Sequence, residues 1–265
     1  MAEIKLISQT QLDGLTASDT SIIPSSNSQD FIKLLKKSLV EGIAYYFLIL
    51  TIYLCQGFSE KFIFGFWCIL MVFGNISGAH VNPIVSLGLF IYKGDMLNPK
   101  NIIRLIFYVI FQLLFGVLAA LSGYYIYKKN LFHIKSGNDD TPWDIFICEF
   151  FFAGTLLFVC LFITCKATSP SNQNFVNLTL VSAWLYIIIN AGSDISGGSY
   201  NPTFYLVLNG LAYFTGKDIH AFQNCWIYLV APFLGSVVFT ILFKYAFKPY
   251  YIAEKKIVIS EDNDD

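Results

Sequence analysis

Two Asn-Pro pairs, Asn82-Pro83 and Asn201-Pro202, each stand at the head of a short apolar stretch. Asparagine is a strong helix N-cap, and proline suits the first helical position because the N–H that it lacks would have no partner there. Each pair therefore predicts the start of a helix. The apolar stretch behind each pair is about nine residues long, which as a helix crosses only about half of a bilayer.

The residues before both pairs, 77–81 and 196–200, are mostly small or polar. Such residues suit irregular backbone, which is tolerated at membrane depth only where protein buries it or water lines it. A loop followed by a half-length helix is therefore typical of a pore. In this arrangement the side-chain amides of Asn82 and Asn201 would be hydrogen-bond donors at the two helix starts.

The two motifs recur at one constant spacing. Ser77 recurs as Ser196, and Asn82 recurs as Asn201, an offset of 119 residues in each case (196 − 77 and 201 − 82). A constant offset between matching motifs indicates an internal repeat. With three membrane spans in each repeat, the odd number inverts the second repeat relative to the first, and the path for a ligand lies where the repeats meet.

The composition of the chain indicates a membrane protein. Of its 265 residues, 55% are hydrophobic and only 13% are charged, against roughly 25% charged residues in soluble domains. The net charge of −1 gives no strong attraction to nucleic acid, so we expect no such partner. The 6 cysteines and 3 histidines show no metal-ligand spacing, so we expect no metal and no cofactor.

Six apolar segments are long enough to span the bilayer core. We place them at 38–56, 61–77, 101–127, 144–165, 175–192 and 223–246. The fold class predicted is an all-α membrane protein with six transmembrane helices, two half-helices and an inverted 3+3 repeat. The domains predicted are a disordered cytoplasmic tail (1–34), a channel domain (35–247, with repeats of about 35–130 and 143–247) and a cytoplasmic C-terminal tail (248–265).

The distribution of basic residues predicts the orientation. If the N-terminus is inside, 12 lysines and arginines fall on the inner side and 5 on the outer side. Cytoplasmic segments carry the excess of Lys and Arg. Both termini are therefore expected in the cytoplasm. The protein itself is expected in the plasma membrane or an intracellular membrane.

The segments 77–83 and 197–202 resemble the two pore loops of the aquaporin, or major intrinsic protein, family. Glu41 and Glu149 match the membrane-embedded glutamates of that family, and the resemblance covers roughly residues 35–247. It implies that the half-helices meet at mid-membrane, where the asparagine amides face a pore. It also implies a homotetramer in the lipid bilayer, each protomer conducting water or small neutral solutes such as glycerol, with no catalytic residues.

The chain departs from the family pattern at the pore. Ile84 and Thr203 replace the alanines of the two Asn-Pro-Ala boxes, and Phe204 stands where the family usually places an arginine at the outer constriction. The resemblance places three further constriction residues by ungapped alignment, with Phe64 as a competitor for the first of them: Phe62, Ile189 and Gly198. The outer constriction is therefore expected to be apolar, as in an unorthodox member of the family.

Two other function classes fit some of these features. A coupled secondary transporter also uses inverted repeats and broken helices, and it would need Glu41 and Glu149 as ionisable groups at its binding site. A structural or junctional membrane protein would have its pore closed by Phe204. The favoured role of the two glutamates is structural, because the irregular backbone of the pore loops needs hydrogen-bond acceptors within the membrane.

Overall fold

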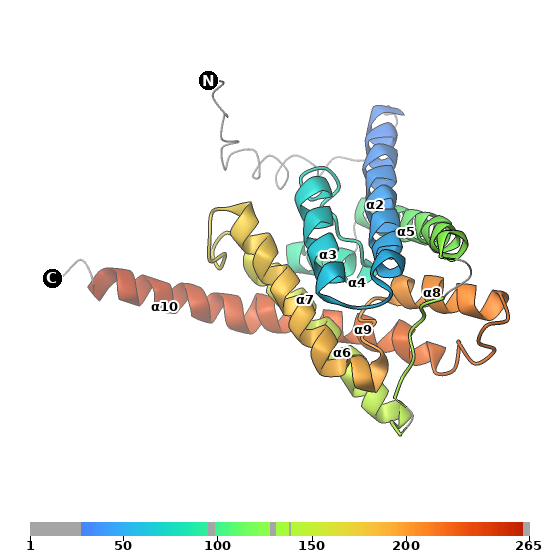
Figure 1. Cartoon of the computed structure of the whole chain (residues 1–265). Helices are drawn as coiled ribbons and strands as arrows, with labels where there is room; N and C mark the ends of the chain where they lie inside the picture. Colours follow the sequence, from blue (N-terminus) through green and yellow to red (C-terminus); the bar gives the residue numbers. More distant parts are fainter. Residues whose placement is uncertain (1–27, 95–98, 128–130, 138, 262–265) are drawn as a thin grey trace.

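The computed structural model describes residues 28–94, 99–127, 131–137 and 139–261 of the chain. These residues form a bundle of helices (Figure 1). In chain order the helices are α2 (Ser28–Cys55), α3 (Glu60–Phe73), α4 (Pro83–Lys93), α5 (Pro99–Ile126), α6 (Pro142–Thr164), α7 (Asn174–Ser196), α8 (Pro202–Phe214), α9 (Cys225–Leu242), the π-helical segment η1 (Phe243–Phe247) and α10 (Lys248–Glu261). The all-α fold class is confirmed.

The two short helices α4 and α8 start at the Asn-Pro pairs. Asn82 is the N-cap of α4 and Asn201 is the N-cap of α8, and each asparagine has extended backbone. The side-chain oxygen of Asn82 accepts a hydrogen bond from Ile84 N at 3.1 Å, and that of Asn201 accepts one from Phe204 N at 3.3 Å. The helices contain 11 and 13 residues, so each is too short to span a bilayer.

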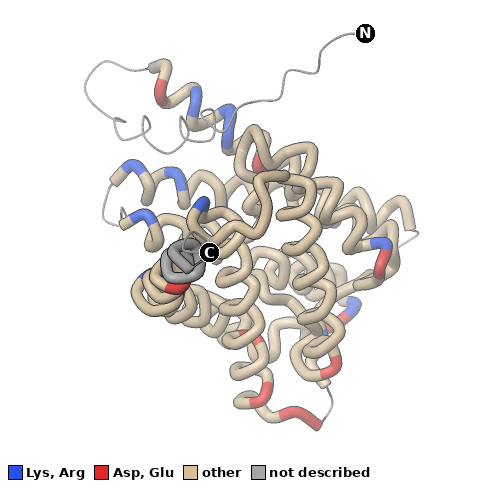
Figure 2. Tube along the Cα trace, turned by 90° about the vertical axis from the view of Figure 1, so that its left-hand side faces the viewer, with Lys and Arg blue, Asp and Glu red and all other residues tan. Residues whose placement is uncertain are grey.

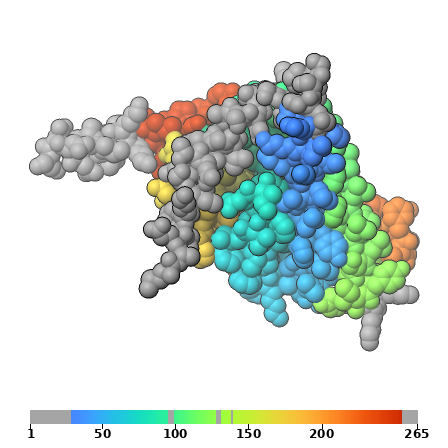
Figure 3. All heavy atoms as spheres, turned by 90° about the horizontal axis from the view of Figure 1, so that it is seen from above, coloured from blue at the N-terminus to red at the C-terminus, as the bar shows by residue number. Residues whose placement is uncertain are grey.

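The two halves of the chain interlock through these half-helices. The long helices pack in pairs, α2 against α5 and α6 against α9, while α4 packs against α9 and α8 packs against α5. Each half-helix therefore contacts the last long helix of the other half. Figure 3 shows α2 in blue between α3 in cyan and α5 in green on one face of the bundle.

Glycines allow the closest of these helix contacts. A Cβ atom on Gly116 of α5 would lie 2.8 Å from the Tyr45 ring, and one on Gly235 of α9 would lie 2.0 Å from Phe150 O. These two glycines are 119 residues apart (235 − 116), the same offset as the Asn-Pro pairs. The repeat in the sequence is thus also a repeat in helix packing.

The predicted spans correspond to helices, with one difference in length. Within the described residues, five helices are long and apolar enough to cross a membrane: α2, α5, α6, α7 and the continuous helix Cys225–Glu254. The predicted span 61–77 is occupied by α3, which ends at Phe73 after 14 residues and reaches about 21 Å. Residues 74–77 form turns that lead into the first pore loop, with Ser77 N donating to Phe73 O at 3.1 Å.

The boundary of the predicted N-terminal tail needs correction. Residues 28–34 are helical rather than disordered, because α2 begins at Ser28. Asp30 suits the positive end of the helix dipole, and Phe31 packs edge-on against Phe107 at 5.9 Å. In the predicted C-terminal tail, α10 extends away from the bundle (Figure 1). The tail predictions for residues 1–27 and 262–265 lie outside the described residues.

Charged residues separate between the two ends of the bundle. Figure 2 shows Lys and Arg mainly at the end where α2 begins and α10 leaves, and Asp and Glu mainly at the opposite end. We call these the inner end and the outer end. Lys128 and Lys129, which the charge count placed outside, lie beyond the described residues, as does Lys5.

Candidate functional site: a pore with an aromatic constriction

A cavity of 690 Å³ runs along the axis of the bundle. Its lining includes Lys93 and Arg104 from the inner end, Asn82 and Asn201 from the starts of the half-helices, and Phe204 near the outer end. We call it the inner cavity. The structure thus places both predicted midplane asparagines on a single internal path.

The two pore loops are joined by a reciprocal pair of hydrogen bonds. The Asn82 amide nitrogen donates to Tyr200 O at 2.9 Å, and the Asn201 amide nitrogen donates to Val81 O at 2.8 Å. Each asparagine therefore caps its own half-helix with its oxygen and holds the opposite loop with its nitrogen. An amide nitrogen carries two hydrogens, and this cross-link uses one of them.

Glu41 accepts backbone hydrogen bonds from the first pore loop. Its carboxylate is fully buried and accepts from His80 N at 3.3 Å and from Val81 N at 2.5 Å. The Gln112 side chain donates to the same carboxylate at 3.1 Å. Because these backbone N–H groups have no helical partner, the carboxylate satisfies donors that would otherwise be costly to bury.

Glu149 has the matching position in the second half. It accepts from Ser199 N at 3.1 Å, from Tyr200 N at 2.8 Å and from the Ser196 hydroxyl at 2.8 Å. The two N–H donors lie 119 residues after His80 and Val81 (199 − 80 and 200 − 81). The acid of each half therefore supports the equivalent pair of loop residues.

The pore loops hold non-glycine residues in left-handed backbone conformations. Ala79, Val81 and Tyr200 have φ values of 42°, 41° and 47°. Such conformations cost of order 1–3 kcal/mol each and persist only where the surroundings enforce them. Val81 and Tyr200 are held by hydrogen bonds from their N–H groups to the buried glutamates and by hydrogen bonds that their carbonyls accept from the two asparagines. Ala79 N donates to the Ser77 hydroxyl at 3.0 Å.

Two tyrosines that sequence reasoning did not assign to the site also hold the loops. Tyr108 of α5 donates its hydroxyl hydrogen bond to Ser77 O, and Tyr228 of α9 donates to Ser196 O, both at 2.7 Å. The two tyrosines are 120 residues apart (228 − 108), one more than the repeat offset. The offset of 119 residues from Tyr228 falls on Val109, so the repeat does not mark Tyr108, and no other pattern in the sequence identifies it.

The residues that replace the two alanines lie outside the path. Ile84 is fully buried in the core, and neither it nor Thr203 lines the inner cavity. The Thr203 hydroxyl donates to the Asn201 side-chain oxygen at 2.9 Å, so it fixes the orientation of that amide. Pro83 and Pro202 are the buried first residues of their helices.

The four residues proposed for the outer constriction come together at the outer end of the inner cavity. Phe62, Ile189, Gly198 and Phe204 all line it. The rings of Phe62 and Phe204 lie 6.3 Å apart, and each side chain is 3% exposed. Phe64, the competing alignment, is 64% exposed and is absent from this lining.

A fifth residue, the aromatic Phe58, was not predicted from the sequence. It lies in the loop between α2 and α3, and its ring is stacked 5.7 Å from Phe204 and lies 5.1 Å from Phe62. The ring of Phe132 packs edge-on against it at 5.4 Å. A loop aromatic has no periodic signal, so nothing in the local sequence marked Phe58 as part of the site.

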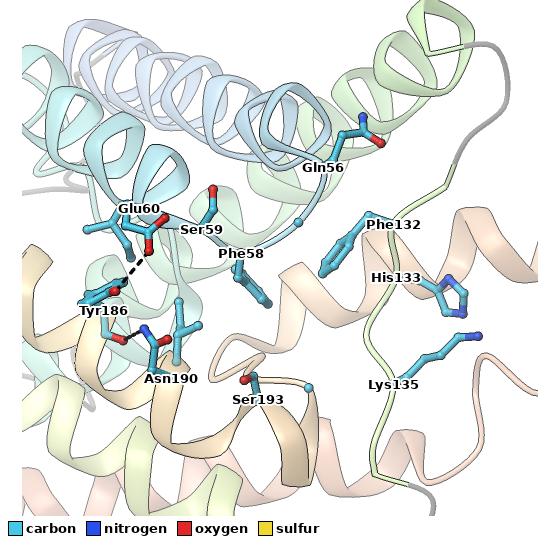
Figure 4. Close-up of a pocket in the computed structure, with 14 residues that line it drawn as sticks. Gln56, Phe58, Ser59, Glu60, Phe132, His133, Lys135, Tyr186, Asn190 and Ser193 are labelled. Carbon is cyan, nitrogen blue, oxygen red and sulfur yellow. Dashed lines mark hydrogen bonds between the residues drawn. The ribbon is translucent and has the colours of Figure 1, made fainter.

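A second cavity of 470 Å³ opens on the outer side of this cluster (Figure 4). We call it the outer cavity. The polar side chains that line it are labelled in Figure 4: Gln56, Ser59, Glu60, His133, Lys135, Tyr186, Asn190 and Ser193. A solute on this side meets hydrogen-bonding groups before it meets the phenylalanine rings.

Residues 131–137, which we call the strap, lie along this cavity and are fixed at three residues. Gly137 N donates to Ile195 O at 3.0 Å. The backbone N–H and C=O of Ile134 both bond to the Asn209 side chain at 2.9 Å. His133 Nε2 lies 2.8 Å from the Asp218 carboxylate. That hydrogen bond, together with one from His220 N, holds the pKa of Asp218 below its usual value. The anchors keep Phe132 beside Phe58.

This combination of features defines a class of protein. Apolar helices of spanning length enclose a lined cavity in which the starts of two half-helices are joined, and this is the architecture of a membrane channel. The asparagine amides lie between the two ends of this cavity, and aromatic rings line its outer end. The buried carboxylates are engaged by the loop backbone.

Comparison with known proteins gives the family. The model of the Major intrinsic protein family matches residues 33–243, and the chain belongs to this family. Nodulin-26 of Glycine max is 26% identical over 248 residues, covering 87% of this chain and 84% of that protein. A glycerol uptake facilitator protein-like 6 of Lactiplantibacillus plantarum is 28% identical over 169 residues, covering 63% and 73%.

A solved structure shares the fold. The aquaglyceroporin from Plasmodium falciparum aligns with a TM-score of 0.69 at 20% sequence identity, over 83% of this chain and 98% of that chain. The inverted six-span fold predicted from the sequence is confirmed. The chain is a passive, non-enzymatic channel of the multi-pass membrane type.

Proposed function

We propose that this channel conducts small neutral solutes of about the size of glycerol and conducts water slowly for its family. The observation that carries the proposal is the constriction itself, where Phe62 and Phe204 face each other and no charged side chain is present among the residues proposed for it. Two related proteins, a glycerol uptake facilitator-like protein and an aquaglyceroporin, support a solute of this class.

A solute gives up hydrogen bonds to water when it enters the constriction. A water molecule that enters a narrow pore gives up water neighbours, and an unpaired polar group costs a few kcal/mol. An arginine at position 204 would offer up to five donors, whereas Phe204 offers none. A carbon-bearing solute loses less, because its apolar surface can contact the rings while its hydroxyl groups reach polar side chains of the outer cavity on one side and the asparagine amides on the other.

The asparagines act in the middle of the path. We assign to Asn82 and Asn201 the donation of their second amide hydrogen to a passing hydroxyl group, since both residues line the inner cavity. The starts of α4 and α8 carry the positive ends of their helix dipoles, and these oppose cations and protons. Neutral solutes pass this barrier at little electrostatic cost.

Neither rival function is favoured by these contacts. A coupled transporter would need Glu41 and Glu149 free to bind an ion, yet both carboxylates accept several hydrogen bonds from the loops. A structural protein with a closed pore would give flux at the background level in reconstituted vesicles. The flux measurement below decides between that role and conduction.

Replacing Phe204 tests the proposal. Phe204→Ala should raise glycerol flux several-fold, because the ring that narrows the constriction is removed, and Phe204→Arg should shift the preference toward water. The measurement is stopped-flow swelling and shrinkage of proteoliposomes containing equal amounts of each protein. Phe64→Ala, at an exposed position of α3, is the control. Fast water flux in the wild type, unchanged in Phe204→Ala, would contradict the proposal.

We propose that both termini face the cytoplasm. The 12 to 5 distribution of Lys and Arg supports this orientation. Tags placed before residue 28 and after residue 261 should be protected from protease in sealed cells and cleaved after permeabilisation. Cleavage of one tag alone in sealed cells would contradict an even number of spans.

We also propose a homotetramer in the lipid bilayer, as the family implies. The apolar side chains left exposed on α5 support a covering of lipid or of neighbouring copies: Ile102, Ile106, Ile110, Leu114, Val117 and Leu118. The pore lies within one protomer, so each copy would conduct by itself.

A further inference from the structure

We infer that Phe58 is a further specificity-determining residue of this channel and sets the largest solute that passes between the outer and inner cavities. The inference deepens the proposed function and rests on it. Phe58 lies outside the set of four constriction residues that the family resemblance implied.

The position of Phe58 between the two cavities is the first argument. Among the described residues, the outer cavity and the inner cavity share two lining residues, Phe58 and Ile189. The other proposed constriction residues that carry rings, Phe62 and Phe204, line the inner cavity alone. A solute that leaves the outer cavity therefore meets Phe58 at the passage between the two spaces.

The ring contacts of Phe58 are the second argument. Its ring is stacked on Phe204 at an interplanar angle of 20° and meets Phe62 and Phe132 edge-on at 72° and 82°. Three neighbours thus fix one ring from three directions. Offset-stacked and edge-to-face geometries are the favourable ones for aromatic pairs, so the ring has a defined position across the passage.

The backbone of the loop is the third argument. Gln56 and Gly57 have φ values of 56° and 120°, so the chain reverses just before Phe58. A Cβ atom on Gly57 would lie 3.1 Å from the Phe132 ring. Glycine at this position therefore permits both the left-handed turn and the close approach of Phe132.

Phe132 acts through Phe58 and is a positioning residue. It stands on the strap, whose next two residues are anchored by Asn209 and Asp218. Figure 4 shows Phe132 reaching from the strap toward Phe58, which projects from the opposite loop. Without the Phe132 ring, Phe58 loses one of its three supports and is free to move toward the outer cavity.

The experiment measures selectivity by size. Wild type, Phe58→Ala, Phe58→Trp and Phe132→Ala are reconstituted, and the permeabilities of two-, three-, four- and five-carbon polyols are measured with water. Phe58→Ala should raise the ratio of four-carbon to three-carbon polyol permeability by on the order of threefold to tenfold, the factor that loss of an aromatic contact represents. Phe58→Trp should lower this ratio.

A double-variant measurement tests whether the Phe58 and Phe132 rings act together on the permeability ratio. If Phe132 only stabilised the fold, its substitution would not change this ratio. Phe132→Ala should shift the size ratio in the same direction by a smaller factor. The double variant should match Phe58→Ala, because Phe132 has no effect once its partner ring is gone. Phe64→Ala, at an exposed residue of the neighbouring helix, should leave every ratio unchanged.

The outcomes separate this inference from the proposed function. If the wild type conducts glycerol and Phe204→Ala alters flux while Phe58→Ala leaves the size ratio unchanged, the inference is overturned and the proposed function stands. If the wild type conducts nothing and Phe58→Ala conducts polyols, the inference is supported. The proposal that the wild-type channel conducts small neutral solutes is then overturned. If Phe58→Ala does not fold, Phe58→Leu and Phe132→Ala must raise the ratio, and an unchanged ratio in both overturns the inference.

Discussion

Glu149→Leu is expected to prevent accumulation of folded protein. The substitution removes the acceptor for Ser199 N, Tyr200 N and the Ser196 hydroxyl, all of which are buried. Each buried donor left without a partner costs about 1–3 kcal/mol. The two backbone N–H groups lose their acceptor, while the Ser196 hydroxyl keeps a longer hydrogen bond to Gly192 O at 3.4 Å. Two such losses approach the lower end of the 5–15 kcal/mol by which a typical domain is stable. Size-exclusion profiles and thermal melting in detergent measure the loss.

Glu149→Gln distinguishes a structural role from proton relay. The amide keeps one acceptor oxygen but turns an NH₂ group toward loop donors, so we expect a melting temperature between those of the wild type and the leucine variant. A relay would instead lose transport at unchanged stability. Glu60→Gln, at an exposed glutamate that contacts Tyr186, is the control. If Glu149→Leu had the same melting temperature as the wild type, the loop would not depend on this carboxylate.

Gly235→Ala is expected to force α9 away from α6. The added methyl group would lie 2.0 Å from Phe150 O, a backbone atom that cannot rotate aside. Overpacking a close contact typically costs 1–3 kcal/mol and sometimes more. Because α9 also supports α4, the half-helix would move with it. We therefore expect a lower melting temperature and reduced flux.

Gly210→Ala provides a matched control within the same bundle. Gly210 lies in α8, and a Cβ atom there would be 3.8 Å from its nearest neighbour, the Phe222 ring, which is ordinary contact. Alanine favours the helix over glycine by about 1 kcal/mol, so stability should be equal or higher. Equal melting temperatures for Gly235→Ala and the wild type would show that the α6–α9 contact can adjust.

The centre of the pore was predictable because two constraints in the sequence coincide there. Helix capping chemistry marked Asn82 and Asn201, and the constant offset showed that both belong to one arrangement. The two glutamates followed because charged residues are costly in apolar spans unless they have partners. These features depend on local chemistry and on the internal repeat, and both can be recognised in a single sequence.

The outer side of the pore was not predictable in the same way. Phe58 and Phe132 are 74 residues apart (132 − 58) in irregular segments, where neither periodicity nor capping patterns report a contact. The anchor between Ile134 and Asn209 joins a strap to a half-helix across 75 residues. The start of α2 at Ser28 was missed because the apolar pattern is weak there, although Phe31 packs against Phe107.

The crossed packing of the half-helices has a consequence for biosynthesis. The Asn82 amide needs the Tyr200 carbonyl, 118 residues later in the chain, and α4 packs against α9, which begins only at Cys225. When the first half leaves the ribosome, its pore loop has no partner for these contacts. Domains that depend on such distant pairings complete their folding late. The first half-helix therefore makes its final contacts only after almost the entire chain has been inserted into the membrane. A chain truncated before α9 cannot complete the walls of the pore.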